Sequence, residues 1–148
     1  PPEQPADVSA WGVGEHTDYG LLTILKQDDC GGLEIKRQGQ WIHAPYEPNT
    51  FVCNMGDMLE RMTGGLYRST LHRVRNVSGR HRYSFPLFFD PGFDVQVGLL
   101  PGCSIIEEPA QSRWDLRSVH AFQGTYGDYL LDKVSKVFPQ LKPAIGKK

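Results

Sequence analysis

The sequence has little of three features that would mark a special class of protein. Of its 148 residues only three are cysteines; they form no Cys-x-x-Cys pair and one stays unpaired in any disulfide scheme, so reduced thiols are expected. The formal net charge is −1, which gives little support to a nucleic-acid or anionic-membrane partner. No apolar run approaches the roughly 18 residues of a membrane helix, and no charged-then-apolar signal peptide opens the chain. We therefore expect a cytoplasmic protein with a small-molecule partner.

The proportions of hydrophobic and charged residues are those of an ordinary globular domain. Hydrophobic residues make up 39% of the chain and charged residues 22%, and its length is that of a single domain. The chain starts at Pro1-Pro2 without an initiator methionine, which we interpret as a sign of a piece from a longer protein. Cys53 lies in an apolar run and is expected in the core.

Short strand-like runs dominate the first hundred residues. The candidate strands, each bounded by turn residues, are 21–25, 33–36, 41–44, 50–55, 67–77 and 82–90. Gln38-Gly39 is expected to turn a β-hairpin, and residues 57–62 to form a short helix. A second helix is predicted over 125–138, where apolar residues recur at helical spacing up to Pro139. Many short strands with one late helix favour an all-β core, either a β-sandwich or a small barrel of jelly-roll type.

Three metal-capable side chains fall on or beside these strands. His16 and Asp18 are one residue apart, between a glycine-rich approach and an aliphatic run. Because side chains i and i+2 of a strand point the same way, both can face one interior point. A later strand offers His72 as a third ligand. Two imidazoles and one carboxylate on one side of a metal form the facial triad of non-haem Fe(II) oxygenases, which leaves three coordination positions open.

A cation and a hydroxyl follow on the next strand. Arg82 and Ser84 have the same i, i+2 spacing, so the guanidinium and the hydroxyl can face the same side. Arginine can hold a carboxylate in a bidentate fork, and serine can add one hydrogen bond. A dicarboxylate held there could chelate the metal with its other end.

Taken in order, these segments resemble the Fe(II)- and 2-oxoglutarate-dependent dioxygenases of the isopenicillin N synthase-like group. The group includes flavonol synthases, gibberellin oxidases and aminocyclopropane carboxylate oxidases. The motifs that carry the resemblance, over about residues 1–101, are GEHTDYGLLTIL, GGLEI, NMGDMLERMTGG, YRSTLHRV and RYSFPLFFDP. The resemblance implies that the iron ligands are His16, Asp18 and His72. It also implies that Arg82 and Ser84 hold the distal carboxylate of 2-oxoglutarate.

The fold implied by the resemblance is a double-stranded β-helix, a distorted, cupin-like jelly roll with iron at its open end. The resemblance also divides the chain into two parts. Residues 1–101 form the jelly-roll core, which includes a short helix, and residues 102–148 form a C-terminal extension that contains a helix. Family members carry an N-terminal helical region and a first jelly-roll strand before a Pro-Pro like Pro1-Pro2, and we interpret both as absent here. A jelly roll without one strand exposes a sheet edge, which favours self-association, although the sequence does not indicate an oligomeric state.

The activity implied by the resemblance is oxidation, in the simplest case hydroxylation, of a small organic molecule. Fe(II) would be the cofactor, 2-oxoglutarate and O2 the co-substrates, succinate and CO2 the products, and ascorbate a candidate reductant. Two alternatives stay open. Some members of the group are Fe(II) oxidases that do not use 2-oxoglutarate and bind a substrate carboxylate with Arg-x-Ser, and the triad does not separate the two. The other alternative is a non-catalytic metal- or ligand-binding module. The substrate itself is not identified by the sequence.

Several other residues have a plainer interpretation. The histidines that we expect at the surface or next to the site, and not on a metal, are His43, His81 and His120. Asp57 is expected to cap the helix at 57–62. The residues that we assign to hydrophobic core in preference to a pocket wall are Tyr19, Leu21, Leu25 and Phe88.

Overall fold

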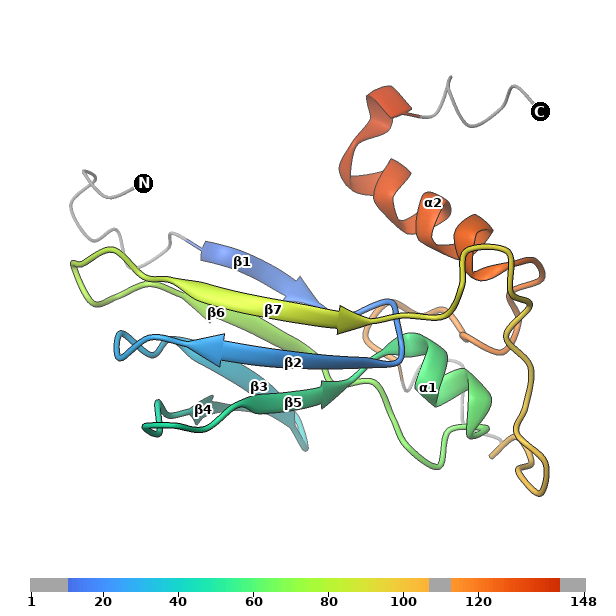
Figure 1. Ribbon diagram of the computed structural model, residues 1–148, viewed down its shortest axis with the longest axis horizontal. Helices are drawn as coiled ribbons and strands as arrows, with labels where there is room; N and C mark the ends of the chain where they lie inside the picture. The colour runs from blue at the N-terminus through green and yellow to red at the C-terminus, as the bar shows by residue number, and fades with distance from the viewer. Residues whose placement is uncertain (1–10, 107–112, 142–148) are drawn as a thin grey trace.

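The computed structural model describes residues 11–106 and 113–141, which form two antiparallel sheets facing each other and two α-helices at one end (Figure 1). The elements in chain order are β1 (Trp11–His16), β2 (Leu22–Gln27), β3 (Leu33–Arg37), β4 (Gln40–Ala44), β5 (Val52–Met55), α1 (Asp57–Met62), β6 (His72–Arg75), β7 (Ser84–Phe89), α2 (Tyr126–Val137) and the 3-10 turn η2 (Pro139–Leu141). No helix within these ranges has the length and apolar character needed to cross a bilayer.

The strand order is that of a jelly roll. One sheet has the order β1-β6-β3-β4 and the other has the order β5-β2-β7. β4 stays in the same sheet as β3, but every other strand lies in the opposite sheet from the strand before it. The chain therefore winds around a common interior. The predicted double-stranded β-helix is therefore confirmed, with the short helix and the C-terminal helix at the expected places in the chain.

The β3–β4 hairpin turns where the sequence predicted. Arg37 pairs with Gln40, and the two residues between them, Gln38 and Gly39, have φ angles of 50° and 80°. Two consecutive positive φ angles match a type I′ turn, whose twist suits the strands it joins. Glycine accepts this conformation without steric cost, which is why Gln-Gly acts as the turn signal.

The helices pack at the end of the sandwich where β1, β5 and β7 finish (Figure 1). Between them lies a cluster of buried hydrophobic residues formed by Met58 of α1, Val97, and Tyr126 and Tyr129 of α2. Tyr19 and Leu21 pack against this cluster, as expected of core residues. The hydrophobic cluster thus lies next to the two sheets, beside the loop that follows β1.

α2 begins with a capping box, in which the Thr125 hydroxyl and the Asp128 carboxylate each accept a backbone N–H of the other residue. The helix ends at Val137, before Pro139, as the sequence predicted. Val137 and Phe138 continue the apolar residues at helical spacing that predicted the helix, but both are largely exposed. The buried face of α2 is therefore shorter than that spacing indicates.

The assignment of Cys53 to the core is wrong. Cys53 lies in β5 and is exposed, whereas its neighbours Val52 and Asn54 are partly buried. Alternation along a strand sends neighbouring side chains to opposite faces, and Cys53 falls on the outer one. The three cysteines all carry free thiols, as expected.

Candidate metal centre

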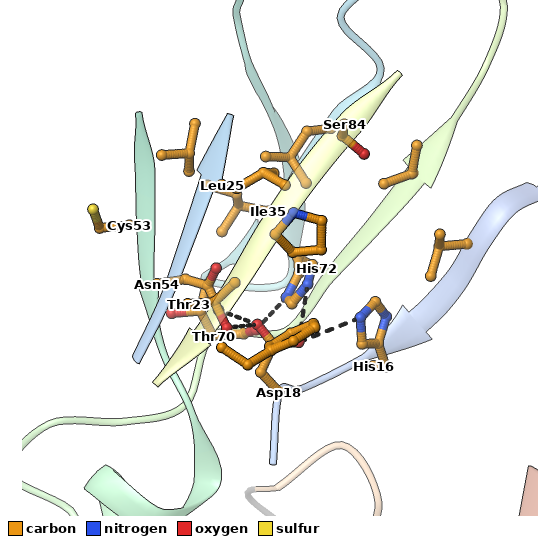
Figure 2. A pocket seen from close by; sticks show the side chains of 16 residues that line it. His16, Asp18, Thr23, Leu25, Ile35, Cys53, Asn54, Thr70, His72 and Ser84 are labelled. Carbon is orange, nitrogen blue, oxygen red and sulfur yellow. Dashed lines mark hydrogen bonds and ion pairs between the residues drawn. The ribbon is translucent and has the colours of Figure 1, made fainter. Parts of the chain in front are cut away.

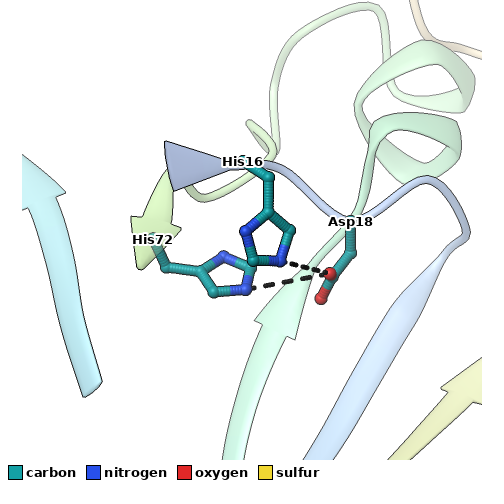
Figure 3. Close-up of side chains that lie close together, drawn as sticks. All are labelled: His16, Asp18 and His72. Atoms are coloured by element: carbon teal, nitrogen blue, oxygen red, sulfur yellow. Dashed lines mark ion pairs between the residues drawn. The ribbon is translucent and has the colours of Figure 1, made fainter. Parts of the chain in front are cut away.

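The three metal-capable side chains of the sequence lie together at the end of β1 (Figure 3). His16 is the last residue of β1 and pairs in register with His72, the first residue of β6, so their rings are 4.2 Å apart between centroids. Asp18 follows two residues after His16. Its Oδ1 lies 3.6 Å from Nε2 of His16 and 3.7 Å from Nε2 of His72.

The backbone of each strand fixes the orientation of its histidine. Nδ1 of His16 lies 2.8 Å from the carbonyl oxygen of Gly14, and Nδ1 of His72 lies 2.8 Å from that of Thr70. A carbonyl oxygen only accepts hydrogen bonds, so each Nδ1 carries the hydrogen and each Nε2 keeps its lone pair. In both rings that lone pair is on the nitrogen nearer Asp18, the tautomer that metal-binding histidines need.

Two polar side chains hold the carboxylate of Asp18. The hydroxyl of Thr23 in β2 donates to Oδ2 of Asp18 at 2.5 Å, and the amide of Asn54 in β5 donates to the same oxygen at 2.7 Å. Asp18 is 8% exposed and Thr23 is 4% exposed, so these bonds are shielded from water. They occupy Oδ2 and leave Oδ1 directed toward the two imidazoles (Figure 2).

Thr23 and Asn54 were not among the residues predicted for the site. A signal was present, because each is a polar residue within an apolar stretch of its strand, and a buried polar side chain needs a hydrogen-bond partner. The strand pattern does not say which partner that is.

Burial lowers the pKa of His72, and the neighbouring His16 lowers it further, against the opposing effects of the Thr70 carbonyl and Asp18. The imidazole of His72 therefore stays neutral to a lower pH than an ordinary imidazole, and the neutral form is the one that binds metal. The Nε2–Oδ1 separations are too long for hydrogen bonds, and they leave space for one ion between the three donors. Two imidazoles and one carboxylate suit Fe(II) and similar divalent ions.

A pocket of about 360 Å³ opens between the two sheets, with the three donors at one end (Figure 2). Its walls are mainly apolar and come from both sheets. Leu25 and Phe88 lie on these walls, so their assignment to the core is wrong. Apolar character alone does not reveal whether a strand residue meets a packed interior or a cavity.

Arg82 and Ser84 face the same side, as predicted. Nη1 of Arg82 donates to the Ser84 hydroxyl at 3.1 Å, and Nε donates to the carbonyl of Gly31 at 2.6 Å. Nη2 is buried and has no hydrogen-bond partner within the described ranges, and burial lowers the pKa of the guanidinium. Ser84 lines the pocket. A buried N–H group without a partner is costly, so this arrangement suits an anionic ligand.

The remaining histidines lie away from the three donors, as expected. His43 is 73% exposed on β4, with its Nε2 3.6 Å from Oε1 of Glu34. His81 stacks on Tyr83, with 6.2 Å between ring centroids. His120 is partly buried, and desolvation lowers its pKa.

The prediction that Asp57 caps α1 is wrong. Gly56 is the N-cap residue and Asp57 is the first residue of the helix. The carboxylate of Asp57 is fully buried and accepts hydrogen bonds from Nη2 of Arg113 and the hydroxyl of Tyr129, both at 2.6 Å. Burial alone would raise the pKa of Asp57, but Arg113 and Tyr129 outweigh it and hold the pKa below its usual range.

Backbone contacts join α1 to the loop that carries Asp18. The N–H of Asp57 donates to the Asp18 carbonyl at 2.8 Å, and the N–H of Met58 donates to the Gly20 carbonyl at 2.9 Å. A Cβ atom at Gly56 would lie 2.4 Å from the Gly20 carbonyl oxygen, so only glycine fits at this position. The first turn of α1 thus finds the acceptors for its free N–H groups in the loop after β1.

The sequence pattern of the 2OG-Fe(II) oxygenase superfamily matches residues 1–91, a range that contains His16, Asp18, His72, Arg82 and Ser84. The chain belongs to this superfamily. Its resemblance to the Fe(II)- and 2-oxoglutarate-dependent oxygenases is thereby confirmed.

Relatives of this superfamily member include longer enzymes. A probable iron/ascorbate oxidoreductase of Dictyostelium discoideum is 60% identical over 139 residues, which are 92% of this chain and 38% of that protein. A 1-aminocyclopropane-1-carboxylate oxidase of Dictyostelium mucoroides is 49% identical over 138 residues, 90% of this chain and 38% of that protein. The crystal structure of a full-length Neurospora crassa protein in complex with alpha-KG and 5-formyluracil superposes with a TM-score of 0.70 at 32% identity, covering 88% of this chain and 41% of that one. The chain therefore spans about two fifths of the length of these relatives.

Proposed function

We propose that the protein containing this chain is a non-haem Fe(II) dioxygenase that uses 2-oxoglutarate and O2 to oxidise a small organic molecule, releasing succinate and CO2. The observation that carries the proposal is the convergence of Nε2 of His16, Nε2 of His72 and Oδ1 of Asp18 at one end of a pocket. Membership of the 2OG-Fe(II) oxygenase superfamily supports it.

In this proposal His16, Asp18 and His72 hold the iron on one face and leave three coordination positions for co-substrate and O2. Iron bound there would supply the activation of O2 that an unactivated C–H bond requires. The residues of the chain supply the rest. The two backbone carbonyls keep the imidazoles in the binding tautomer, and Thr23 and Asn54 keep Oδ1 of Asp18 directed at the ion.

In the same proposal, Arg82 and Ser84 bind the distal carboxylate of 2-oxoglutarate. The buried Nη2 of Arg82 has a hydrogen to donate, and the Ser84 hydroxyl lies on the pocket wall. The apolar walls between them and the three donors would exclude water and strengthen the ion pair. One end of the dicarboxylate would then be fixed by Arg82 while the other reaches the iron.

We also propose the division of the chain inferred from the resemblance, with a jelly-roll core at 1–101 and a C-terminal extension at 102–148. The protein would act in the cytoplasm on a small molecule, without a nucleic-acid or membrane partner, with ascorbate as reductant.

Among the described strands, β7 is an edge strand of the three-stranded sheet, and its Phe85, Leu87 and Phe89 are each more than 60% exposed. That apolar edge is where self-association would occur.

An Fe(II) oxidase that does not use 2-oxoglutarate is the second candidate. It is favoured by the relatives named 1-aminocyclopropane-1-carboxylate oxidase, which are 49% identical to this chain. In that case Arg82 would bind a carboxylate of the substrate. A non-catalytic binding module is less well supported, because all three donors and the Arg-x-Ser pair are present.

A panel of co-substrates tests the proposed function on the complete protein. With Fe(II), ascorbate and 2-oxoglutarate, we expect iron-dependent release of succinate, with one succinate formed for each O2 consumed. Succinate would be measured by chromatography and O2 with an electrode. Consumption of O2 with a carboxylate-bearing substrate and without succinate would favour the oxidase. Binding of metal and 2-oxoglutarate without any turnover of O2 would favour the module.

Metal affinity is expected to weaken as the pH falls below about 6.5, the ordinary pKa of imidazole, because protons compete with the metal for Nε2. Burial lowers the pKa of His72 from this value, so His72 should keep its metal-binding form to a lower pH than an ordinary imidazole. Titration with Mn(II), an inert substitute for Fe(II), from pH 7.5 to 5.5 would measure the effect. Unchanged Mn(II) affinity over this range would argue against histidine ligands.

A further inference from the structure

Arg113 lies outside the range that matches the superfamily, yet its side chain is buried beside the loop that carries Asp18. The side chain is 9% exposed, and its guanidinium contacts three carboxylates. Nη2 is 2.6 Å from Oδ1 of Asp57, Nη1 is 3.1 Å from Oε2 of Glu60, and Nε is 2.9 Å from Oδ1 of Asp115. These carboxylates raise the pKa of Arg113 above its usual range despite burial, so the side chain is always charged.

The same guanidinium also contacts both segments that carry the three donors. Nη2 donates to the hydroxyl of Thr17 at 3.3 Å, and Nη1 donates to the hydroxyl of Ser69 at 3.0 Å. Thr17 is 1% exposed and lies between His16 and Asp18 in the sequence. Ser69 directly precedes Thr70, whose carbonyl binds Nδ1 of His72.

Two of the carboxylates extend these contacts to the same two segments. The backbone N–H of Asp57 donates to the Asp18 carbonyl at 2.8 Å. Oε2 of Glu60 accepts hydrogen bonds from the N–H of Ser69 at 2.7 Å and from its hydroxyl at 2.6 Å. Arg113 therefore reaches the His16–Asp18 loop and the approach to His72 both directly and through α1.

α2 closes the network from the other side. The hydroxyl of Tyr129 donates to Oδ2 of Asp57, and Nζ of Lys133 lies 3.4 Å from the same oxygen and 3.3 Å from Oδ2 of Asp115. All of these side chains are largely buried, with Lys133 and Asp115 at 13% exposure. A buried, mutually bonded network of this kind fixes the positions of its members.

We propose that Arg113 is a positioning residue of the metal centre, which sets the relative placement of the His16–Asp18 loop and the segment that leads to His72. The proposal rests on the proposed function, because it requires that these residues bind a metal. In this proposal, residues beyond position 91 help to position the side chains of the metal centre. Arg113 touches no metal ligand side chain, so it acts through Thr17, Ser69, Asp57 and Glu60.

The test compares Arg113→Lys with Arg117→Lys in the complete protein. Lysine keeps the charge beside Asp57, but its single ammonium cannot bond to both hydroxyls and all three carboxylates. Arg117 is the matched control, because its side chain is 65% exposed and lies 4.0 Å from Asp132. Mn(II) affinity would be measured by electron paramagnetic resonance, and the visible bands of bound Co(II) would report the ligand geometry. Thermal unfolding of the metal-free proteins would be recorded in parallel.

Arg113→Lys is expected to weaken Mn(II) binding about 10-fold or more and to change the Co(II) bands at temperatures where the protein is fully folded. Thr17→Val, which removes only the hydroxyl, should weaken Mn(II) binding roughly 3-fold. Adding Thr17→Val to Arg113→Lys should cause no further loss, because the two changes break the same contact. Arg117→Lys should match the wild type.

A folded Arg113→Lys variant with wild-type Mn(II) affinity and unchanged Co(II) bands would overturn the proposal, even if its metal-free form unfolds at a lower temperature. If Arg113→Lys does not fold, Thr17→Val and Ser69→Ala decide, and wild-type Mn(II) affinity in both would overturn it. Absence of Mn(II) binding by the wild type itself would instead refute the proposed function, and this inference with it.

Discussion

Replacing His16, Asp18 or His72 by alanine is expected to abolish the stabilisation of the protein by metal. Each change removes one of the three side chains that we propose as the metal ligands. A metal present at 100 times its dissociation constant stabilises the native state by about 2.7 kcal/mol, which corresponds to roughly 5–10 °C in Tm for a protein of this size or somewhat larger. Thermal unfolding with and without Mn(II) would measure the shift, which should be near zero in all three variants. Succinate release should fall below detection.

His43→Ala is the matched control for this set. His43 is exposed on β4 and lies outside the three-donor group, so its variant should keep the full metal-dependent shift in Tm. The assignment would be wrong if His72→Ala kept wild-type iron affinity while His43→Ala lost it.

Arg82→Leu is expected to lower the affinity for 2-oxoglutarate about 100-fold while iron binding survives. The change leaves the three donors untouched but puts a carboxylate in a partly desolvated pocket without its counter-charge, and breaking such a pair costs on the order of 3 kcal/mol. Arg82→Lys should restore only part of the affinity, because the bidentate fork is lost. Ser84→Ala should cost about 1 kcal/mol, as the loss of one hydrogen bond.

The measurement is the visible charge-transfer absorption expected of the Fe(II)–2-oxoglutarate complex, recorded without oxygen on the complete protein. Arg80→Leu serves as control, because Arg80 is 60% exposed and pairs with Asp29 at the surface. Wild-type protein that gives no such absorption at millimolar 2-oxoglutarate, yet consumes O2 with a carboxylate-bearing substrate, would establish the oxidase alternative. Arg82 would then be the anchor of the substrate.

Local patterns were enough to predict the framework of the fold. The turn at Gln38-Gly39 depends on two residues, and the strands depend on alternation within four to six residues. The grouping of His16, Asp18 and His72 was also predicted, from the i, i+2 spacing of the first two and from the family resemblance for all three. The pairing of β6 with β1, which brings His72 beside His16, is seen only in the structure.

Asp57 and the residues that hold Asp18 were misread or missed because their surroundings come from distant parts of the chain. Asp57 looked like a helix cap, but its partner Arg113 is 56 residues further on and belongs to no regular element. The polar contacts of Asp18 with Thr23 and Asn54 depend on how β2 and β5 meet the loop after β1. Spacing along a single strand carries no information on either arrangement.

The two backbone carbonyls that hold His16 and His72 have a further consequence for how an ion is captured. Each acceptor lies two residues earlier in the same chain segment, so the rings are oriented by main-chain geometry that exists without an ion. Little side-chain entropy is then lost when the ion binds, which strengthens the binding. Competition among divalent ions at such a rigid site would be decided by ionic radius and preferred coordination number, with the protein adapting little to either.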